Sequence, residues 1–239
     1  MNKTKVLVTG ANRGIGLTLC KLLASRDNFT VILSSRNASE GQQQVNHLVN
    51  LGFDVHFLAL DVSDLSSFSS KITTLIDNFG SIDILVNNAG VYLDSADLDE
   101  FPSFFELSED ILETTLSTNL FGPMLLSQLF SEYMNEGGLI INVSSGGGKI
   151  NTSGDRSGHI AYRLSKTALN AFSKSFSNRL QVKNITIVSM CPGWVKTDLG
   201  GPNAPKSIKE GTEDILDLIT NKDSLVSGSF YYNSFQQKL

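Results

Sequence analysis

Short apolar runs rich in β-branched residues alternate with longer amphipathic stretches along the chain, and this alternation constrains the fold more than any other feature. Strands this short and this apolar are typical of parallel strands that are buried on both faces. Right-handed crossovers then place helices on both sides of one open sheet. We therefore predict a single-domain α/β fold with a doubly wound parallel sheet of about seven strands. The predicted strands are residues 5–9, 29–34, 55–60, 82–86, 138–143, 185–190 and, as a possible seventh, 228–232.

Helical periodicity fills the intervals between these runs. Apolar residues recur every three or four positions, as in Val45, Leu48 and Val49, which is the pattern of a helix with one buried face. The other predicted helices are residues 16–25, 65–79, 109–133 with a possible break at 122–123, and 161–180. Two loop-like stretches, 91–107 and 146–160, follow strands at the carboxyl edge of the sheet, where such folds bind ligands.

The composition indicates one folded domain spanning residues 1–239. The chain is 41% hydrophobic and 18% charged, with a net charge of −5 and a mean hydropathy near zero. A disordered chain has fewer apolar residues and a larger net charge. A domain of this size buries enough surface to need no disulfide or metal for stability.

Charge, cysteine usage and hydropathy limit which partners and which cellular location we expect. A mildly acidic chain lacks the basic field that nucleic acid binding needs. Cys20 and Cys191 are far apart and adjoin no His cluster, so we expect buried thiols and no metal site. No run approaches the roughly 18–20 apolar residues of a membrane span, and the first apolar run, residues 6–8, is too short for a signal-peptide core. We therefore expect a cytoplasmic protein with no membrane partner.

A glycine-rich stretch follows the first predicted strand and opens the first predicted helix. Gly10, Gly14 and Gly16 are spaced G-x-x-x-G-x-G. Glycines permit a tight turn that brings the backbone close to a pyrophosphate at the helix N-terminus. Three glycines also occur in ordinary strand–helix turns, but the position after the first strand favours nucleotide binding.

The end of the second predicted strand indicates which dinucleotide is bound. A carboxylate there would accept hydrogen bonds from a ribose 2′-hydroxyl and favour NAD, whereas this strand ends in Ser35 and Arg36. Arg13, in the glycine-rich stretch, can reach the same place. Two guanidinium groups around a 2′-phosphate would form charge-assisted hydrogen bonds, so the residues favour NADP(H). The alternative is that both arginines are simply solvated.

Tyr162 and Lys166 are the pair that points most directly to chemistry. Residues four apart on a helix share a face, with Cβ atoms roughly 5–6 Å apart. An ammonium beside a phenol favours the phenolate and lowers a pKa that is normally about 10, so the tyrosine could exchange a proton with a substrate oxygen. Ser144 and Ser145 follow the fifth predicted strand and can offer a hydroxyl to the same oxygen. Such Tyr/Lys pairs also occur as surface contacts.

Together these motifs resemble the short-chain dehydrogenase/reductase family. The matching stretches run in the family's order across nearly the whole chain: 9–16, 61–62, 87–90, Asn119, 144–145, 162–166 and 192–197. Within the family, the Asn-Ala-Gly-Val stretch at 88–91 and the Pro-Gly-Trp-Val-Lys-Thr-Asp stretch at 192–198 look most like NADPH-dependent carbonyl reductases. The resemblance implies a Rossmann-type fold and an NADP-dependent oxidoreductase.

The resemblance also assigns roles to individual residues. Tyr162 would protonate a carbonyl oxygen as hydride arrives from the nicotinamide, and Lys166 would lower its pKa and bind the nicotinamide ribose. Ser145, with Ser144 as the fallback, would hold the substrate oxygen, and Asn119 would hold a water that links Lys166 to solvent. The remaining implied cofactor contacts are Gly10, Arg13 and Ile15 at the phosphates and adenosine, Ser35 and Arg36 at the 2′-phosphate, Asp61 and Val62 at the adenine, Asn88 at the adenosine-side ribose, and Val195 and Thr197 at the carboxamide and phosphate region.

The expected activity is the NADPH-dependent reduction of an aldehyde or ketone to an alcohol, in a mostly apolar pocket lined by residues 91–107, 146–160 and 194–205. Two alternatives stay open. One is an alcohol- or steroid-type dehydrogenase acting in the oxidising direction. The other is a catalytically silent NADP-binding regulatory protein, against which the intact Ser145, Tyr162 and Lys166 argue. The residues do not identify the natural substrate.

The assembly state is less constrained. The spacing from Ser145 to Tyr162 is longer than in many family members and much shorter than in some monomeric carbonyl reductases. The family often pairs the 161–180 helix and the preceding one across a two-fold axis, so we expect a homodimer or homotetramer. The alternative is that the apolar residues of this helix all pack on the sheet and loops. Those residues, which span more of the helix than one sheet-facing stripe needs, are Ala168, Leu169, Ala171, Phe172, Phe176 and Leu180.

Overall fold

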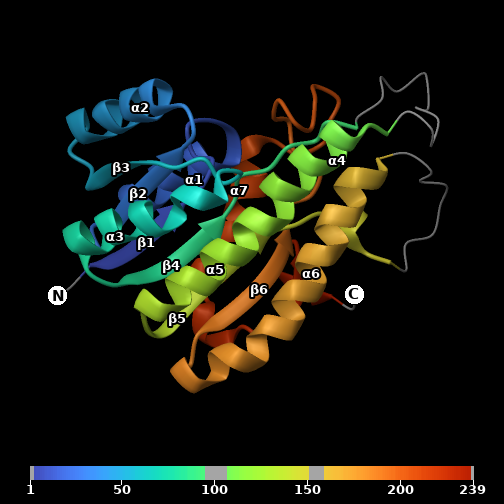
Figure 1. Cartoon of the computed structure of the whole chain (residues 1–239). Coiled ribbons are helices and arrows are strands. Elements are labelled where there is room, and N and C mark those ends of the chain that lie inside the picture. The colour runs from blue at the N-terminus through green and yellow to red at the C-terminus, as the bar shows by residue number, and fades with distance from the viewer. Residues whose placement is uncertain (1–2, 95–106, 151–158, 238–239) are drawn as a thin grey trace.

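Strands and helices alternate along the chain, as the hydrophobic pattern predicts (Figure 1). The computed structural model describes residues 3–94, 107–150 and 159–237. The strands are β1 (Thr4–Val8), β2 (Phe29–Ser35), β3 (Val55–Ala59), β4 (Ile82–Asn87), β5 (Met134–Val143), β6 (Thr186–Cys191), β7 (Phe230–Tyr232) and β8 (Phe235–Gln237). The helices are α1 (Gly14–Ala24), α2 (Ala38–Asn50), α3 (Phe68–Phe79), α4 (Glu109–Leu116), α5 (Gly122–Tyr133), α6 (Ile160–Leu180) and α7 (Ile208–Thr220).

The strands form one sheet in the order β3-β2-β1-β4-β5-β6-β7-β8. Neighbours are parallel from β3 through β7, and only β8 pairs antiparallel, with β7. The chain winds outward from β1 in one direction and then, from β4, in the other. The predicted doubly wound parallel sheet is therefore confirmed, and the change of direction at β1 marks the edge where such folds bind ligands.

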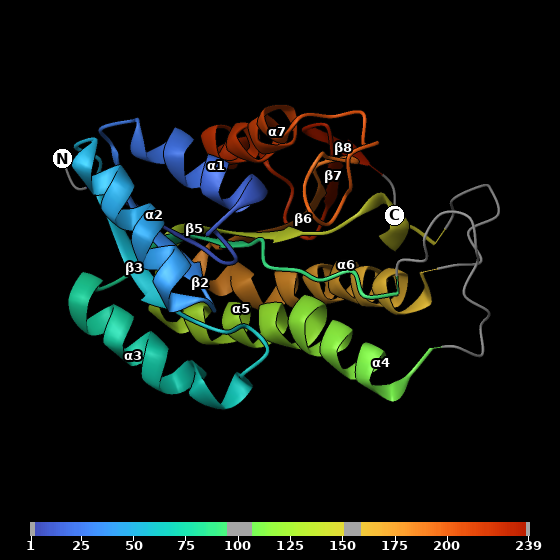
Figure 2. The same cartoon turned by 90° about the horizontal axis from the view of Figure 1, so that it is seen from above.

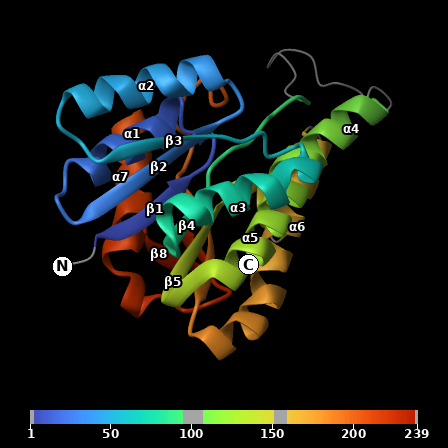
Figure 3. The same cartoon turned by 60° about the vertical axis from the view of Figure 1, so that its left-hand side comes forward.

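Two helical layers cover the sheet, with α1, α2 and α7 on one face and α3, α5 and α6 on the other (Figure 2). Successive side chains of a strand point to opposite faces. In β1, Val6 and Val8 accordingly join the core under α1, whereas Leu7 joins the core under α3 and α5. Figure 3 brings forward the β3 edge, where α2 packs beside the strand.

Some boundaries differ from the sequence prediction. Helix α7 was not predicted, although Ser207 and Glu210 form a capping box at its start. Strand β8 was not predicted either. It is short, and a turn at Asn233 and Ser234, both with positive φ, folds it back on β7. The break expected at residues 122–123 is instead a π-helical turn, Ser117–Phe121, between α4 and α5.

Four polar side chains form a hydrogen-bonded network between the sheet and α6. The Asn142 carboxamide in β5 accepts from Asn87 Nδ2 in β4 at 2.7 Å, and its own Nδ2 donates to Ser173 Oγ in α6 at 2.9 Å. Ser189 Oγ in β6 donates to the same Ser173 hydroxyl at 2.8 Å. All four residues are buried. The network therefore links three neighbouring strands to one helix.

None of the helices in the described part of the chain combines the length and the apolar character that crossing a bilayer requires.

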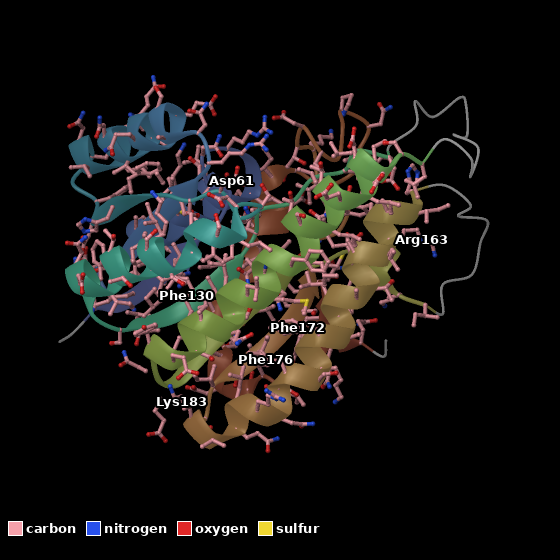
Figure 4. The ribbon with its side chains drawn as sticks, viewed as in Figure 1. Asp61, Phe130, Arg163, Phe172, Phe176 and Lys183 are labelled. Carbon is pink, nitrogen blue, oxygen red and sulfur yellow. The ribbon has the colours of Figure 1, made fainter. Side chains whose placement is uncertain are left out.

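The substitution Phe130→Ala should show how much the core under α5 stabilises the fold. Phe130 is fully buried on the sheet side of α5 (Figure 4). Its truncation should lower the free energy of unfolding by about 3–5 kcal/mol, because it removes apolar burial and leaves a cavity. Chemical denaturation measures this loss. Phe235→Ala is the matched control, since Phe235 is 73% exposed on β8. Equal losses for the two variants would contradict the assigned core.

Candidate active site

The carboxyl ends of β1, β4, β5 and β6 meet at one edge of the sheet, because these strands are parallel and adjacent. The segments that leave these four ends carry most of the residues singled out by the sequence. Helix α6 begins beside the same edge and continues along the sheet, next to α5 (Figure 1). Stretches that are far apart in the sequence therefore converge on one site.

Tyr162 and Ser145 face one another in this site. Tyr162 lies in the first turn of α6, and the Ser145 side chain is near enough to its phenol for hydrogen bonding to lower the pKa of that phenol. Ser145 Oγ is held in turn by the backbone N–H of Gly147, at 3.1 Å. Ser144 points elsewhere, since its Oγ donates to the Lys166 carbonyl at 3.4 Å. The fold thus brings Ser145, and not Ser144, to the tyrosine.

Desolvation acts on both Tyr162 and Lys166. Lys166 is buried, its Nζ donates to the Val143 carbonyl at 2.9 Å, and this nitrogen lies 5.7 Å from the centre of the Tyr162 ring. Burial lowers the pKa of Lys166 to about 8. Desolvation raises the pKa of Tyr162 to about 12, against a smaller opposing effect of the Ser145 hydrogen bond. The sequence prediction of a lowered tyrosine pKa therefore differs from the structure, in which the phenol is protonated at neutral pH.

Asn119 clamps the segment that follows β4. It lies in the π-helical turn, a distortion that is frequent at functional sites. Its Nδ2 donates to the Val91 carbonyl and its Oδ1 accepts from the Val91 N–H, both at 2.8 Å. A third bond runs from Nδ2 to Ser165 Oγ at 3.2 Å. The Asn119 side chain thus uses both ends of its amide to hold the backbone at Val91. Its expected role in holding a water stays a prediction.

Sequence reasoning missed three residues of the site. The Tyr92 ring packs against both His159 and Tyr162, with ring centroids 5.0 and 4.6 Å apart. Asp94 Oδ2 accepts a hydrogen bond from the N–H of Ala161, at 2.7 Å. Cys191 Sγ accepts backbone N–H groups of the segments after β5 and β6, at 3.1 and 3.4 Å. The available signal was their position: Cys191 is the last residue of β6, and Tyr92 and Asp94 lie in the segment that follows β4. Cys191 and Cys20 are both buried thiols, as predicted.

The glycine-rich turn has the shape that a pyrophosphate needs. Gly10 has a φ of +62°, and a Cβ there would lie 2.7 Å from Ala89 Cα. A Cβ on Gly16 would lie 2.6 Å from Asn88 Nδ2. Helix α1 begins without a side-chain cap at Arg13 and without an acidic residue in its first turn. Its first N–H groups are therefore suited to an anion.

Several other residues predicted to bind the cofactor mainly shape this end of the site. Asn88 Nδ2 donates to the carbonyls of Thr9 and Gly10, at 2.9 and 3.1 Å, and so braces the glycine turn. Asp61 lies after β3 (Figure 4), where its carboxylate accepts from the N–H and hydroxyl of Ser63. Val62 is buried and Ile15 is half-buried.

The arginines expected at the 2′-phosphate differ in their surroundings. Arg13 forms an ion pair with Asp198, with 2.6 Å between Nη1 and Oδ2, and both side chains are exposed. Arg36 is exposed at the end of β2, and the neighbouring Ser35 is buried, with its hydroxyl donating to the Asn37 carbonyl at 2.7 Å. The structure therefore joins Arg13 to the segment that follows β6.

That segment lies over the glycine turn. Val195 is buried, and a Cβ on Gly14 would come within 3.6 Å of Thr197 Cγ2. Among the residues that the structure describes, no group of three His, Cys, Asp or Glu side chains is placed to hold a metal ion. Much of the predicted substrate pocket, residues 95–106 and 151–158, lies outside the described residues, and with it most of the 146–160 loop.

Comparisons with known proteins agree with this geometry. A family model for short chain dehydrogenases matches residues 4–207. Human carbonyl reductase (NADPH) 1 is 28% identical, with 87% of each chain covered. A 3-oxoacyl-(acyl-carrier-protein) reductase, FabG, of Chlamydia pneumoniae is 32% identical over 82% of this chain and 75% of its own.

Solved structures give the same result. NADPH-bound carbonyl reductase from chicken fatty liver superposes with a TM-score of 0.82 at 27% identity, covering 98% of both chains. The carbonyl reductase Sniffer of D. melanogaster gives a TM-score of 0.83 at 29% identity, covering 98% of this chain and 97% of its own. The resemblance seen in the motifs is confirmed, and the chain belongs to the short-chain dehydrogenase/reductase family of oxidoreductases.

Proposed function

We propose that the protein reduces an aldehyde or ketone to an alcohol with NADPH. The observation that carries this proposal is the proximity of the Ser145 side chain to the Tyr162 phenol, with the buried Lys166 one turn further along the same helix. With a pKa raised to about 12, the Tyr162 phenol holds its proton at neutral pH, which is the form that can protonate a carbonyl oxygen. Oxidation of an alcohol would need the phenolate. The carbonyl reductases among the relatives support the same direction.

Each residue of the site has its own role in the proposed reaction. The nicotinamide, when bound, supplies hydride to the carbonyl carbon. Ser145 Oγ holds the carbonyl oxygen, and Tyr162 donates its hydroxyl proton to that oxygen, so the C=O group becomes C–OH. Lys166 stabilises the phenolate that is left behind, since an ammonium favours a nearby anion. With a pKa of about 8, Lys166 is charged at neutral pH and loses this charge as the pH rises further.

For the cofactor, we propose that the glycine turn holds the pyrophosphate and that Arg13 and Arg36 face the 2′-phosphate. The uncapped start of α1 and the close packing at Gly10 support this placement. The other contacts that the family resemblance implies belong to the same proposal: Ile15, Ser35, Asp61, Val62, Asn88, Val195 and Thr197. We also infer a cytoplasmic location, which the two free cysteines support, since a reducing compartment keeps thiols unpaired.

Tyr162→Phe should abolish most turnover while NADPH still binds. The substitution removes only the hydroxyl, and general acid catalysis contributes about 10²–10⁴-fold to rate. Following NADPH absorbance with a panel of aldehydes and ketones measures turnover and also searches for the substrate, and fluorescence titration measures NADPH binding. Tyr133→Phe, at a 43% exposed tyrosine on α5, is the matched control and should behave as wild type. Near wild-type turnover by Tyr162→Phe would rule out this proton donor.

The enzyme should prefer NADPH to NADH by at least tens-fold in kcat/KM. Hydrogen bonds to charged groups contribute about 1.5–3 kcal/mol each, and 1.4 kcal/mol is about tenfold in affinity. Ser35→Asp combined with Arg36→Ala should shift the preference toward NADH, because it repels the phosphate and removes its partner. Both cofactors are compared on one carbonyl substrate at fixed ionic strength. Arg26→Ala, at an exposed arginine after α1, should leave the ratio unchanged. Equal kcat/KM values for wild type would overturn the cofactor assignment.

We propose further that α5 and α6 pair with a second copy of the chain. The rings of Phe172 and Phe176 stack with their centroids 5.1 Å apart (Figure 4). They line a groove that also contains Val182 and Lys183. Leu169 and Leu180 of the predicted apolar set are buried in the core instead, and Ala171 is exposed.

Light scattering should therefore give at least twice the 26.0 kDa of one chain. Phe176→Glu should yield a monomer, because the charge would be buried at the interface. Glu132→Gln, at an exposed groove residue, removes a charge without introducing one and should leave the assembly intact. A wild-type mass of one chain at micromolar concentration would exclude the pairing.

A further inference from the structure

Asp94 caps the helix that carries the proposed catalytic pair, although it lies 67 residues before Ala161, in the first turn of that helix. Its Oδ2 accepts the backbone N–H groups of Ala161 at 2.7 Å and of Tyr162 at 3.3 Å. These are among the first N–H groups of α6, which have no partner within the helix. The Asp94 carbonyl also contacts His159 Nδ1, at 3.1 Å. One residue therefore fixes both the start of α6 and the residue before it.

Helix α6 has no cap of its own. Its N-cap residue, His159, is in the left-handed region with a φ of 66° and makes no side-chain cap bond, and the first turn has no acidic residue. By contrast, α2, α4 and α7 are each capped by the side chain of the residue immediately before them, Asn37, Ser108 and Ser207 respectively. The cap of the catalytic helix comes instead from the segment after β4.

A carboxylate is a costly choice at this position. Asp94 is only 9% exposed, and its Oδ1 has no hydrogen-bond partner among the residues that the structure describes. Burying a charged oxygen without a partner is unfavourable, and a neutral serine or asparagine caps a helix about as well as aspartate does. Capping therefore explains one oxygen of Asp94 and leaves its buried charge unexplained.

We propose that Asp94 is a positioning residue for Tyr162, holding the first turn of α6 against Ser145 and placing a negative charge near the phenol. This proposal rests on the proposed role of Tyr162 as proton donor. The segment that carries Asp94 is itself fixed, because Asn119 clamps Val91 through two hydrogen bonds. Between those two points the Tyr92 ring packs on the Tyr162 ring.

The charge of Asp94 opposes ionisation of the tyrosine. Desolvation is the main cause of the raised pKa of Tyr162, and charges at Cys191 and Asp94 add to it. Burial also raises the pKa of the Cys191 thiol, so near neutral pH the added charge is that of Asp94. In the described part of the chain, the other titratable groups around Tyr162 are Lys166 on the same helix, His159 just before it, and Tyr92.

Removing the Asp94 charge should lower the pKa of Tyr162. Carbonyl reduction needs the protonated phenol, so the alkaline fall of the reduction rate should begin at lower pH. Alcohol oxidation needs the phenolate, so the alkaline rise of the oxidation rate should also begin at lower pH. A purely structural cap would change the rates without moving either of these two limbs of the pH profiles.

Two substitutions separate the cap from the charge. Asp94→Ala removes both and should lower kcat on the order of tenfold to hundredfold, because small misplacements of a catalytic group carry costs of this size. Asp94→Asn keeps an acceptor oxygen, so it should recover most of the rate at neutral pH while both pH limbs stay shifted to lower pH. NADPH binding, measured by fluorescence titration, should change little in either variant. Ser207→Ala, which removes the cap of α7, should lower Tm and leave the pH profile unchanged.

The outcomes are distinguishable. A pH profile of Asp94→Asn that overlays the wild-type profile overturns the proposal, and so does wild-type kcat in a folded Asp94→Ala. If Asp94→Ala does not fold, Asp94→Asn alone decides. Tyr162→Phe, assayed in parallel, separates the two claims. If it is inactive while the Asp94 variants match wild type, only the positioning role fails, whereas wild-type turnover by Tyr162→Phe refutes the proposed function itself.

Discussion

The position of the catalytic helix depends on the polar network buried between α6 and the sheet. The side chains of Asn87, Asn142, Ser173 and Ser189 lie in a layer closed by helices, where a polar group without a partner is costly. Sliding or rotating α6 would break the bonds that Ser173 makes to both β5 and β6. Asn87 Oδ1 has no partner among the described residues, but the bonds that the four side chains do make favour one arrangement of this core. Because Lys166 lies about two turns before Ser173, the network also sets how the reacting side chains stand relative to the strand ends.

Desolvation shifts the pKa values of Tyr162 and Lys166, the proposed catalytic groups, in opposite directions. Loss of hydration disfavours the charged form of any group, so it raises the pKa of Tyr162 to about 12 and lowers that of Lys166 to about 8. Near neutral pH the tyrosine is still an acid and the lysine is still a cation. The combination suits a group that must keep its proton until the carbonyl oxygen becomes basic, beside a charge that favours the resulting phenolate.

The features that could be predicted from the sequence are those that short stretches of residues determine. Short apolar runs gave the strands through β7, and the spacing of Tyr162 and Lys166 placed them on one helix. The choice between Ser144 and Ser145 depends on the turn at Gly146–Gly148, whose conformation no residue pattern fixes in advance. The Asp94 cap and the Arg13–Asp198 pair join residues 67 and 185 positions apart, so only the folded chain shows them. Helix α7 is different, since its capping box was legible in the sequence.

The pair between Arg13 and Asp198 bears on how a phosphate would be accommodated. Both side chains are about 70% exposed, and an ion pair in such surroundings contributes only about 0–1 kcal/mol. The proposed 2′-phosphate is a dianion that can accept two hydrogen bonds from one guanidinium. It would therefore compete with the Asp198 carboxylate for Arg13. Its binding would free Asp198, whose segment lies over the glycine turn near Thr197. In the proposed cofactor placement, recognition of the 2′-phosphate and the position of that segment would thus be linked through Arg13.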